Sequence, residues 1–201
     1  MTRVFIDSSV FFSAACPSRG HARDLILMAL GGETDLVLSR IVIEETRRNL
    51  LESAPESVPV MELVLQSVSH EIIRPSREQV ITAAKYTALK DAAIAAAARE
   101  AAVDLLVTLD RKHLLGRPDL ARHVGADIVM PQEAVRRLMH GKGSKMRKVK
   151  HTLLDKLVIG LLRLNYRLSA GSYRSALLVS KLQIIEAETR SGFIAQRTRL
   201  P

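Results

Sequence analysis

Short apolar runs alternate with helix-like segments along the first 140 residues, and this alternation restricts the possible folds more than any other feature. Five runs rich in β-branched or bulky apolar residues have the pattern of strands, at residues 3–6, 35–39, 70–73, 104–108 and 127–129. Strands that alternate with helices form a parallel sheet covered by helices on both faces. The sequence therefore predicts an α/β domain with a central parallel sheet.

Capping signals mark several of the predicted helices. Ser39 fits an N-cap, Ser76 with Gln79 fits a capping box, and Pro131 suits the first residue of a helix. We expect helices at residues 9–16, 21–30, 39–51, 60–68, 76–89, 90–102 and 131–138, with a helical turn at 111–116. Each predicted strand is thus followed by helical structure, as a parallel sheet requires.

The composition narrows the class of protein. With 47% hydrophobic residues, the 201-residue chain can build a core. Its single cysteine excludes a disulfide framework and a cysteine zinc cluster, and 3% aromatic residues argue against recognition by base stacking. The start has no signal-peptide pattern and no apolar stretch reaches 18 residues, so we expect a cytoplasmic protein without a membrane span.

Positive charge is concentrated at the end of the chain. Residues 1–140 carry 17 Lys and Arg against 18 Asp and Glu, whereas residues 141–201 carry 13 against 3. The pattern predicts a basic linker over 140–150 and a basic helical hairpin over 151–201. Two interpretations remain open: an RNA-binding appendage, or an amphipathic hairpin that packs on the core or a second subunit. The first would use Lys156, Arg163 and Arg167.

Four acidic residues occupy corresponding places in the predicted fold. Asp7 and Asp110 follow strands, Asp91 opens the alanine-rich helix, and Glu45 lies one turn into the helix after the second strand. Because these places share one edge of a parallel sheet, the carboxylates can converge. Clustered carboxylates cannot all stay ionised unaided, so either their pKa values rise or a cation neutralises them. Oxygen ligands favour Mg²⁺ or Mn²⁺, which assist displacement at a phosphodiester. The chemistry implied is hydrolysis of a nucleic-acid backbone.

Each acid also has a structural interpretation. Asp91 fits an ordinary N-cap, and Asp7 and Asp110 fit residues that form turns after strands. Glu45 fits a solvated helix residue beside Glu44. The prediction of a site therefore depends on the set of four and not on any one of them.

The four acids stand in short motifs that follow one another in a fixed order. These are residues 4–10, 39–50, 90–98 and 106–110, with a closing strand and helix at 127–134. Over about residues 2–139 the ordered set resembles the PIN domain nucleases, especially the VapC-like toxins of toxin–antitoxin pairs. The resemblance implies a three-layer α/β/α sandwich over residues 1–139, a Mg²⁺- or Mn²⁺-dependent ribonuclease, frequent homodimers and a cognate antitoxin.

The resemblance also assigns the acids. Asp7, Glu45, Asp91 and Asp110 match the acidic quartet that binds metal and carries out catalysis. Glu44 competes with Glu45 for the second place, and Glu45 is preferred because the family's glutamate stands five residues before a leucine, here residue 50.

Four further positions are compared with the family pattern. Thr108 matches a hydroxyl that would orient the ligands, and Ser9 stands where the family often has Asn. Lys112 and His113 stand where the family commonly has another acid. Without that acid, the residues favour a site for one metal ion over a site for two.

Basic residues lie next to two of the acids. Arg47 and Arg48 follow Glu45, and Arg111 with Lys112 follows Asp110. These four could hold the phosphates of RNA or pair with neighbouring acids. The leading prediction is thus a metal-dependent endoribonuclease that acts as a toxin. The alternatives are a PIN nuclease of RNA processing and an inactive PIN-like module that binds RNA or protein.

Overall fold

Five parallel strands form one sheet in this computed structural model, which describes residues 1–16 and 20–140 of the chain. Their order is β3-β2-β1-β4-β5. They are β1 (Arg3–Ile6), β2 (Asp35–Ser39), β3 (His70–Ile73), β4 (Leu105–Val107) and β5 (Asp127–Val129). Each agrees with its predicted strand to within one residue at either end. The chain leaves β1 towards β2 and β3 and later returns to the other side of β1 at β4, so the topological switch point lies between β1 and β4.

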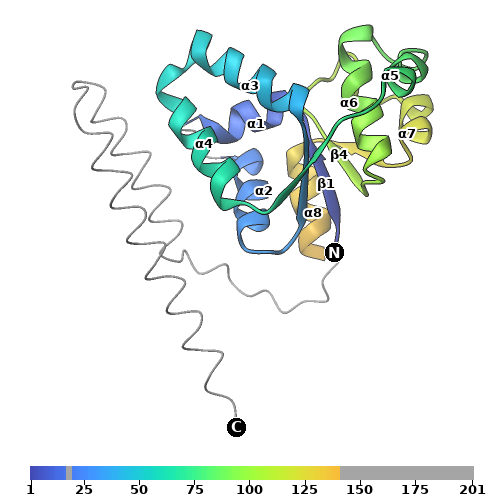
Figure 1. Cartoon of the computed structure of the whole chain (residues 1–201). Coiled ribbons are helices and arrows are strands. Elements are labelled where there is room, and N and C mark those ends of the chain that lie inside the picture. The colour runs from blue at the N-terminus through green and yellow to red at the C-terminus, as the bar shows by residue number, and fades with distance from the viewer. Residues whose placement is uncertain (17–19, 141–201) are drawn as a thin grey trace. The chain divides into compact units, whose positions relative to one another are not determined.

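Helices cover both faces of the sheet and give a three-layer α/β/α sandwich, as predicted (Figure 1). One layer holds α1 (Ser8–Ala15), α2 (His21–Leu30), α3 (Arg40–Ser53), α4 (Val58–Ser67) and α8 (Pro131–His140), with a 3₁₀ turn at Pro55–Ser57. The other holds α5 (Arg77–Ala83), α6 (Leu89–Glu100) and α7 (Pro118–Val124). Phe5, Leu38 and Leu106 of the central strands are fully buried between the layers.

The predicted caps are present. The Ser39 hydroxyl accepts a hydrogen bond from the Val42 amide at 3.3 Å and starts α3. Ser76 and Gln79 form the reciprocal bonds of a capping box at the start of α5. These caps fix where the chain turns back from β2 and β3, and so help to set the position of the helices that frame the sheet edge.

The prediction was wrong in two places, at the end of α5 and at α7. Helix α5 ends at Ala83 and not near residue 89, and α7 was not predicted. Contacts distant in sequence explain the early end, because the Tyr86 ring stacks on His123 of α7 with centroids 4.2 Å apart. Arg117 also donates to the Tyr86 carbonyl at 3.0 Å. Tertiary packing therefore overrides the local helical pattern here.

The predictions about membrane spans and about the C-terminal segment depend on which residues the structure describes. Within residues 1–16 and 20–140, no helix is long and apolar enough to cross a membrane. The linker from residue 141 and the hairpin over 151–201, with Lys156, Arg163 and Arg167, lie outside the described residues. The domain boundaries drawn from the sequence therefore stay predictions.

Candidate active site

Asp7 comes directly after β1, and only 4% of its surface is exposed. Its Oδ1 accepts hydrogen bonds from the Ser8 amide at 2.5 Å and the Ser8 hydroxyl at 3.1 Å. Its Oδ2 accepts from the hydroxyls of Ser9 at 2.9 Å and Thr108 at 2.7 Å. Four donors thus hold this buried carboxylate, which also serves as the N-cap of α1.

The hydroxyls of Ser9 and Thr108 link the end of β1 to the residues after β4. Thr108 Oγ1 donates to Asp7 and accepts from the Asp110 amide at 3.0 Å. Ser9 Oγ donates to Asp7 and accepts from the Leu109 amide at 3.2 Å. Each hydroxyl therefore couples the position of Asp7 to the chain segment that carries Asp110.

Asp110 organises the turn that follows β4. Its Oδ1 accepts from the amides of Lys112 at 2.8 Å and His113 at 2.9 Å, and its Oδ2 lies 3.0 Å from Nδ1 of His113. Burial raises the pKa of Asp110, but the hydrogen bonds from His113 and Lys112 outweigh it and hold the pKa below its usual value. Asp110 is therefore a turn former, as its structural interpretation had it, and also a charged group.

Asp91 and Asp7 are the two buried acids of the site, and the charge of Asp91 is the less compensated. It lies in the first turn of α6, but Ala88 is the N-cap and no side chain caps the helix, so the N-cap interpretation was wrong. Only 7% of its surface is exposed, and Oδ2 is buried without a hydrogen-bond partner among the described residues. The closest basic nitrogens are His113 Nδ1 at 3.8 Å and Lys90 Nζ at 4.0 Å. Burial raises the pKa of Asp91, with Lys90 opposing and Asp110 and Asp7 adding to the rise.

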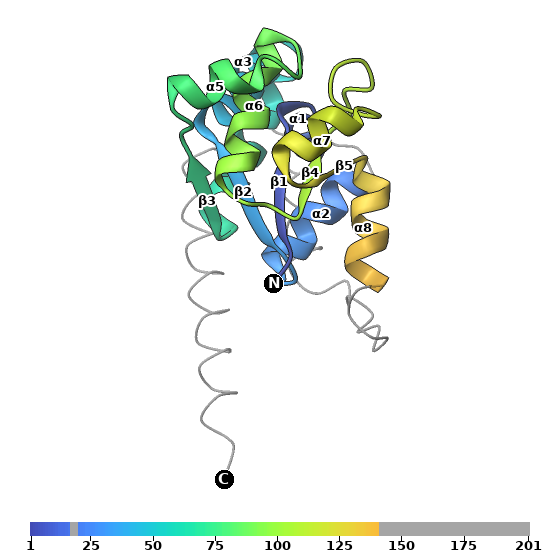
Figure 2. The same ribbon diagram turned by 90° about the vertical axis from the view of Figure 1, so that its right-hand side faces the viewer.

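These acids meet at the carboxyl edge of the sheet. In Figure 2, β1 runs upward from the labelled N-terminus, so this edge lies at the top of the view. One donor atom from each of Asp91, Asp110 and His113 lies within 4.8 Å of the others. Asp7 is outside this group, but its charge helps to raise the pKa of Asp91, and the Thr108 hydroxyl links it to the Asp110 amide. A buried carboxylate oxygen that lacks a partner, beside further carboxylates, fits a divalent cation well.

A match to a protein-family model identifies the domain. The PIN domain family model matches residues 4–116, which is more than half of the chain and spans all four predicted acids. The chain belongs to the PIN domain family. PIN domains are generally nucleases, hydrolases that act on nucleic acids, and typically use divalent metal ions.

The similarity of the chain to individual proteins is low. No curated protein matches the chain. Among solved structures, the crystal structure of PAE2754 from Pyrobaculum aerophilum aligns with 19% sequence identity and a TM-score of 0.49. The alignment covers 69% of this chain and 96% of that one.

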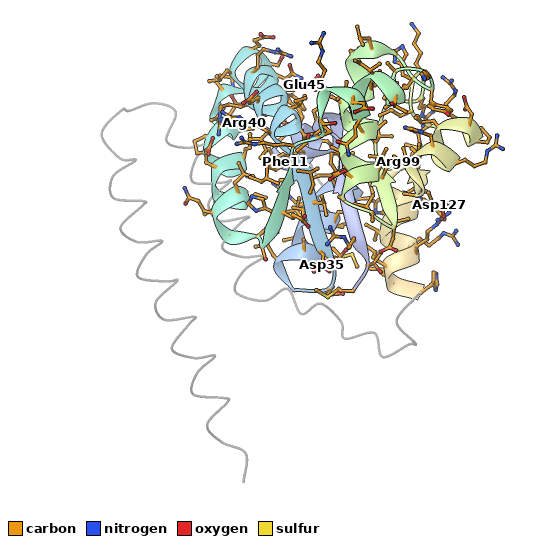
Figure 3. The ribbon with its side chains drawn as sticks, turned by 45° about the vertical axis from the view of Figure 1, so that its right-hand side comes forward. Phe11, Asp35, Arg40, Glu45, Arg99 and Asp127 are labelled. Atoms are coloured by element: carbon orange, nitrogen blue, oxygen red, sulfur yellow. The ribbon has the colours of Figure 1, made fainter. Side chains whose placement is uncertain are left out.

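Glu45 and Glu44, the two candidates for the second acid of the predicted quartet, lie on α3. Figure 3 shows Glu45 at the end of the molecule opposite to Asp35, the residue that begins β2. Glu45 is half-buried, whereas Glu44 is exposed and pairs with Arg40 at 2.7 Å. The next residue, Thr46, is fully buried and donates a long hydrogen bond of 3.4 Å to the Ser8 carbonyl. Helix α3 thus packs beside Asp7, and the surroundings favour Glu45 over Glu44.

The four basic residues near the acids differ in their surroundings. Arg47 pairs with Glu62 of α4 at 2.7 Å, so its guanidinium is engaged within the protein. The Arg111 side chain approaches the sulfur of Met130 at 3.8 Å. Arg48 and Lys112 are exposed and form no ion pair within the described part of the chain. Arg48, Arg111 and Lys112 are therefore better placed than Arg47 to meet a phosphate.

His113 is the site residue that the sequence interpretation missed. It was noted only as a departure from the acid that PIN domains often carry there, yet its ring faces both Asp110 and Asp91. The available signal was the spacing, because a histidine three residues after a turn-forming aspartate can fold back onto it. The sequence alone does not show that Asp91 would face the same ring.

Proposed function

We propose that this PIN domain is a metal-dependent endoribonuclease. One observation supports this more than any other: the buried Oδ2 of Asp91 has no hydrogen-bond partner in the described structure. The negative charges of Asp110 and Asp7 lie close enough to raise the pKa of Asp91 further. Such an arrangement costs free energy in the metal-free protein and is relieved by a cation. A protein whose only need was stability would not keep three acids together at a switch point.

The acids of the site would have different roles in binding the ion and the attacking water. Asp91 and Asp110 would hold the ion, and Asp7, fixed by Ser9 and Thr108, would add the third negative charge. The half-buried Glu45 would bind the ion or orient the attacking water. The bound ion would supply the charge that stabilises an in-line displacement at a phosphodiester.

The substrate and the biological role belong to the same proposal. We assign RNA as the substrate and toxicity as the role because the ordered motifs resemble VapC-like toxins. Arg48, Arg111 and Lys112 would contact the RNA backbone, and the activity would take place in the cytoplasm. A cognate antitoxin and a homodimer would accompany that role. Growth arrest on induced expression, relieved by the product of a neighbouring small reading frame, would separate a toxin from an RNA-processing nuclease.

The proposal predicts an absolute requirement for a divalent ion. The purified full chain should cleave single-stranded RNA with Mg²⁺ or Mn²⁺, and excess chelator should reduce cleavage to background because the clustered carboxylates cannot act without the cation. Gel analysis of end-labelled RNA measures the rate, and restored cleavage on adding the ion back controls for unfolding. Cleavage at an undiminished rate in chelator would refute the proposal.

A matched pair of substitutions tests the second acid. Glu45→Gln should lower the cleavage rate by about a hundredfold, since a charge at the site is worth about 3 kcal/mol in the transition state. Glu44→Gln should leave the rate within about twofold, because Glu44 is exposed and paired with Arg40. The same RNA cleavage assay compares both variants. The reverse ranking would give the second position to Glu44.

A further inference from the structure

His113 lies against two of the carboxylates. Its Nδ1 is 3.0 Å from Asp110 Oδ2 and 3.8 Å from Asp91 Oδ2, and Asp91, Asp110 and His113 each place one donor atom within 4.8 Å of the others. The side chain is three-quarters buried. An imidazole nitrogen is therefore part of the same group of donors as the two carboxylates.

The backbone holds His113 in this position. Its amide donates to Asp110 Oδ1 at 2.9 Å, and its carbonyl accepts from the Thr87 hydroxyl at 3.0 Å. The next residue, Leu114, is fully buried in the core. Three independent contacts thus fix the turn, so the ring faces the acids without further rearrangement of the chain.

The unpartnered oxygen of Asp91 points to a ligand at this group. Asp91 is more than nine-tenths buried, and its Oδ2 has no hydrogen-bond partner in the described structure. The nearest nitrogen from another part of the chain is His113 Nδ1, which at 3.8 Å is beyond hydrogen-bond distance. A cation between these groups would satisfy the oxygen and would bind the ring nitrogen in place of the proton that Nδ1 shares with Asp110.

We infer that His113 is a nitrogen ligand of the divalent ion, and that it makes this site prefer Mn²⁺ to Mg²⁺. The inference rests on the proposed function, because it concerns the same ion. Mg²⁺ takes oxygen ligands almost exclusively. Mn²⁺ also prefers carboxylates, but as a first-row transition-metal ion it accepts an imidazole nitrogen more readily than Mg²⁺ does. The oxygen-only ligand set predicted from the sequence distinguishes the two ions less than a set with one nitrogen.

A different role for the imidazole makes the opposite prediction. If His113 served only as a positive counter-charge to Asp91 and Asp110, it would compete with the ion for the carboxylates. Removing it would then strengthen the binding of Mn²⁺ and Mg²⁺ alike. If His113 is instead a metal ligand, removing its ring removes that ligand, and the affinity for Mn²⁺ falls more than the affinity for Mg²⁺.

Metal binding to the full chain, without RNA, tests the inference. The loss of the free Mn²⁺ signal in electron paramagnetic resonance measures Mn²⁺ affinity, and displacement by Mg²⁺ measures the preference. His113→Ala should weaken Mn²⁺ binding about tenfold or more and Mg²⁺ binding less. His113→Asp should restore an oxygen-only set and keep both ions bound, with the preference reduced by about tenfold. Pulsed spectra should show nitrogen coupling to Mn²⁺ only where His113 is present.

His21→Ala provides the matched control. His21 also faces a carboxylate three residues away, Asp24 at 3.2 Å, but it is about half exposed on α2 and meets only one acid. The control should bind both ions as the unsubstituted chain does. Circular dichroism of each variant checks that it is folded.

The outcomes separate the two proposals. A chain that binds neither ion would remove the metal on which the proposed function depends. A chain that binds ions, but whose Mn²⁺ preference and nitrogen coupling survive in His113→Ala, would overturn only the role of His113. Tighter binding of both ions in His113→Ala would likewise overturn it in favour of the counter-charge.

Discussion

Asp7→Asn and Asp91→Asn should each lower RNA cleavage by about a thousandfold, yet they should shift the stability of the metal-free protein in opposite directions. Loss of about 4 kcal/mol of transition-state stabilisation accounts for the shared effect on rate. The opposite effects on folding follow from the contacts of the two carboxylates. Four donors surround Asp7, whereas one oxygen of Asp91 has no partner in the described structure.

The Asp7 carboxylate is a well-satisfied buried charge. The hydroxyls of Ser9 and Thr108 both donate to Oδ2 and already accept from backbone amides. An amide nitrogen in place of Oδ2 would present hydrogens to these groups and leave the hydroxyl hydrogens without an acceptor. Because hydrogen bonds to a charged group are worth about 1.5–3 kcal/mol, Asp7→Asn should reduce the free energy of unfolding by about 2 kcal/mol.

The Asp91 carboxylate is a poorly satisfied buried charge. It is desolvated, its Oδ2 has no partner among the described residues, and Asp110 and Asp7 repel it. An asparagine of the same shape removes the charge and its desolvation penalty. Asp91→Asn should therefore raise the free energy of unfolding by about 1 kcal/mol when chelator is present. The gain should disappear in saturating Mn²⁺, because the ion stabilises only the unsubstituted site.

Urea unfolding with chelator and with Mn²⁺, together with RNA cleavage, measures both effects. Asp24→Asn is the control, because Asp24 is about half exposed on α2 and should change neither quantity appreciably. If Asp91→Asn destabilised the metal-free protein as much as Asp7→Asn does, the role of Asp91 would be structural. The argument for a cation at this site would then fail.

The sequence predicted those parts of the fold that depend on local signals. The strands stand out because Val, Ile, Leu and Phe occur in short runs, and Ser39 and Ser76 mark helix starts through bonds within four residues. The end of α5 depends instead on the stacking of Tyr86 on His123, 37 positions away in the chain. A pattern read in a local window does not contain that contact.

The site shows the same division. The convergence of Asp7, Asp91 and Asp110 was predictable because a parallel sheet gathers the carboxyl ends of its strands at one edge. The position of His113 beside these acids was not predictable. It depends on how Asp110 shapes the turn and on how α6 brings Asp91 to the same ring. The distinction between a satisfied Asp7 and an unsatisfied Asp91 also required the side-chain contacts.

Thr108→Val should be the most damaging single change that leaves every charge of the site in place. Thr108 is fully buried, and its hydroxyl both donates to Asp7 Oδ2 at 2.7 Å and accepts from the Asp110 amide at 3.0 Å. Valine keeps the shape but leaves one bond fewer on the carboxylate and an amide without its acceptor. The free energy of unfolding should fall by about 3 kcal/mol, in proportion to a hydrogen bond to a charge and a lost backbone partner.

Thr108→Ser separates the hydroxyl from the packing. Serine keeps both hydrogen bonds and loses one methyl group, so it should cost only about 1 kcal/mol and leave cleavage near the original rate. Thr46→Val provides the second comparison, because Thr46 is equally buried but makes only a 3.4 Å bond to the neutral Ser8 carbonyl. It should cost less than Thr108→Val in urea unfolding. In RNA cleavage, Thr108→Val should be at least about tenfold slower than Thr108→Ser, since Asp110 loses the link that positions it relative to Asp7. Equal stability and equal rates in the valine and serine variants would show that the hydroxyl bridge positions nothing, and that the strand ends alone place the two aspartates.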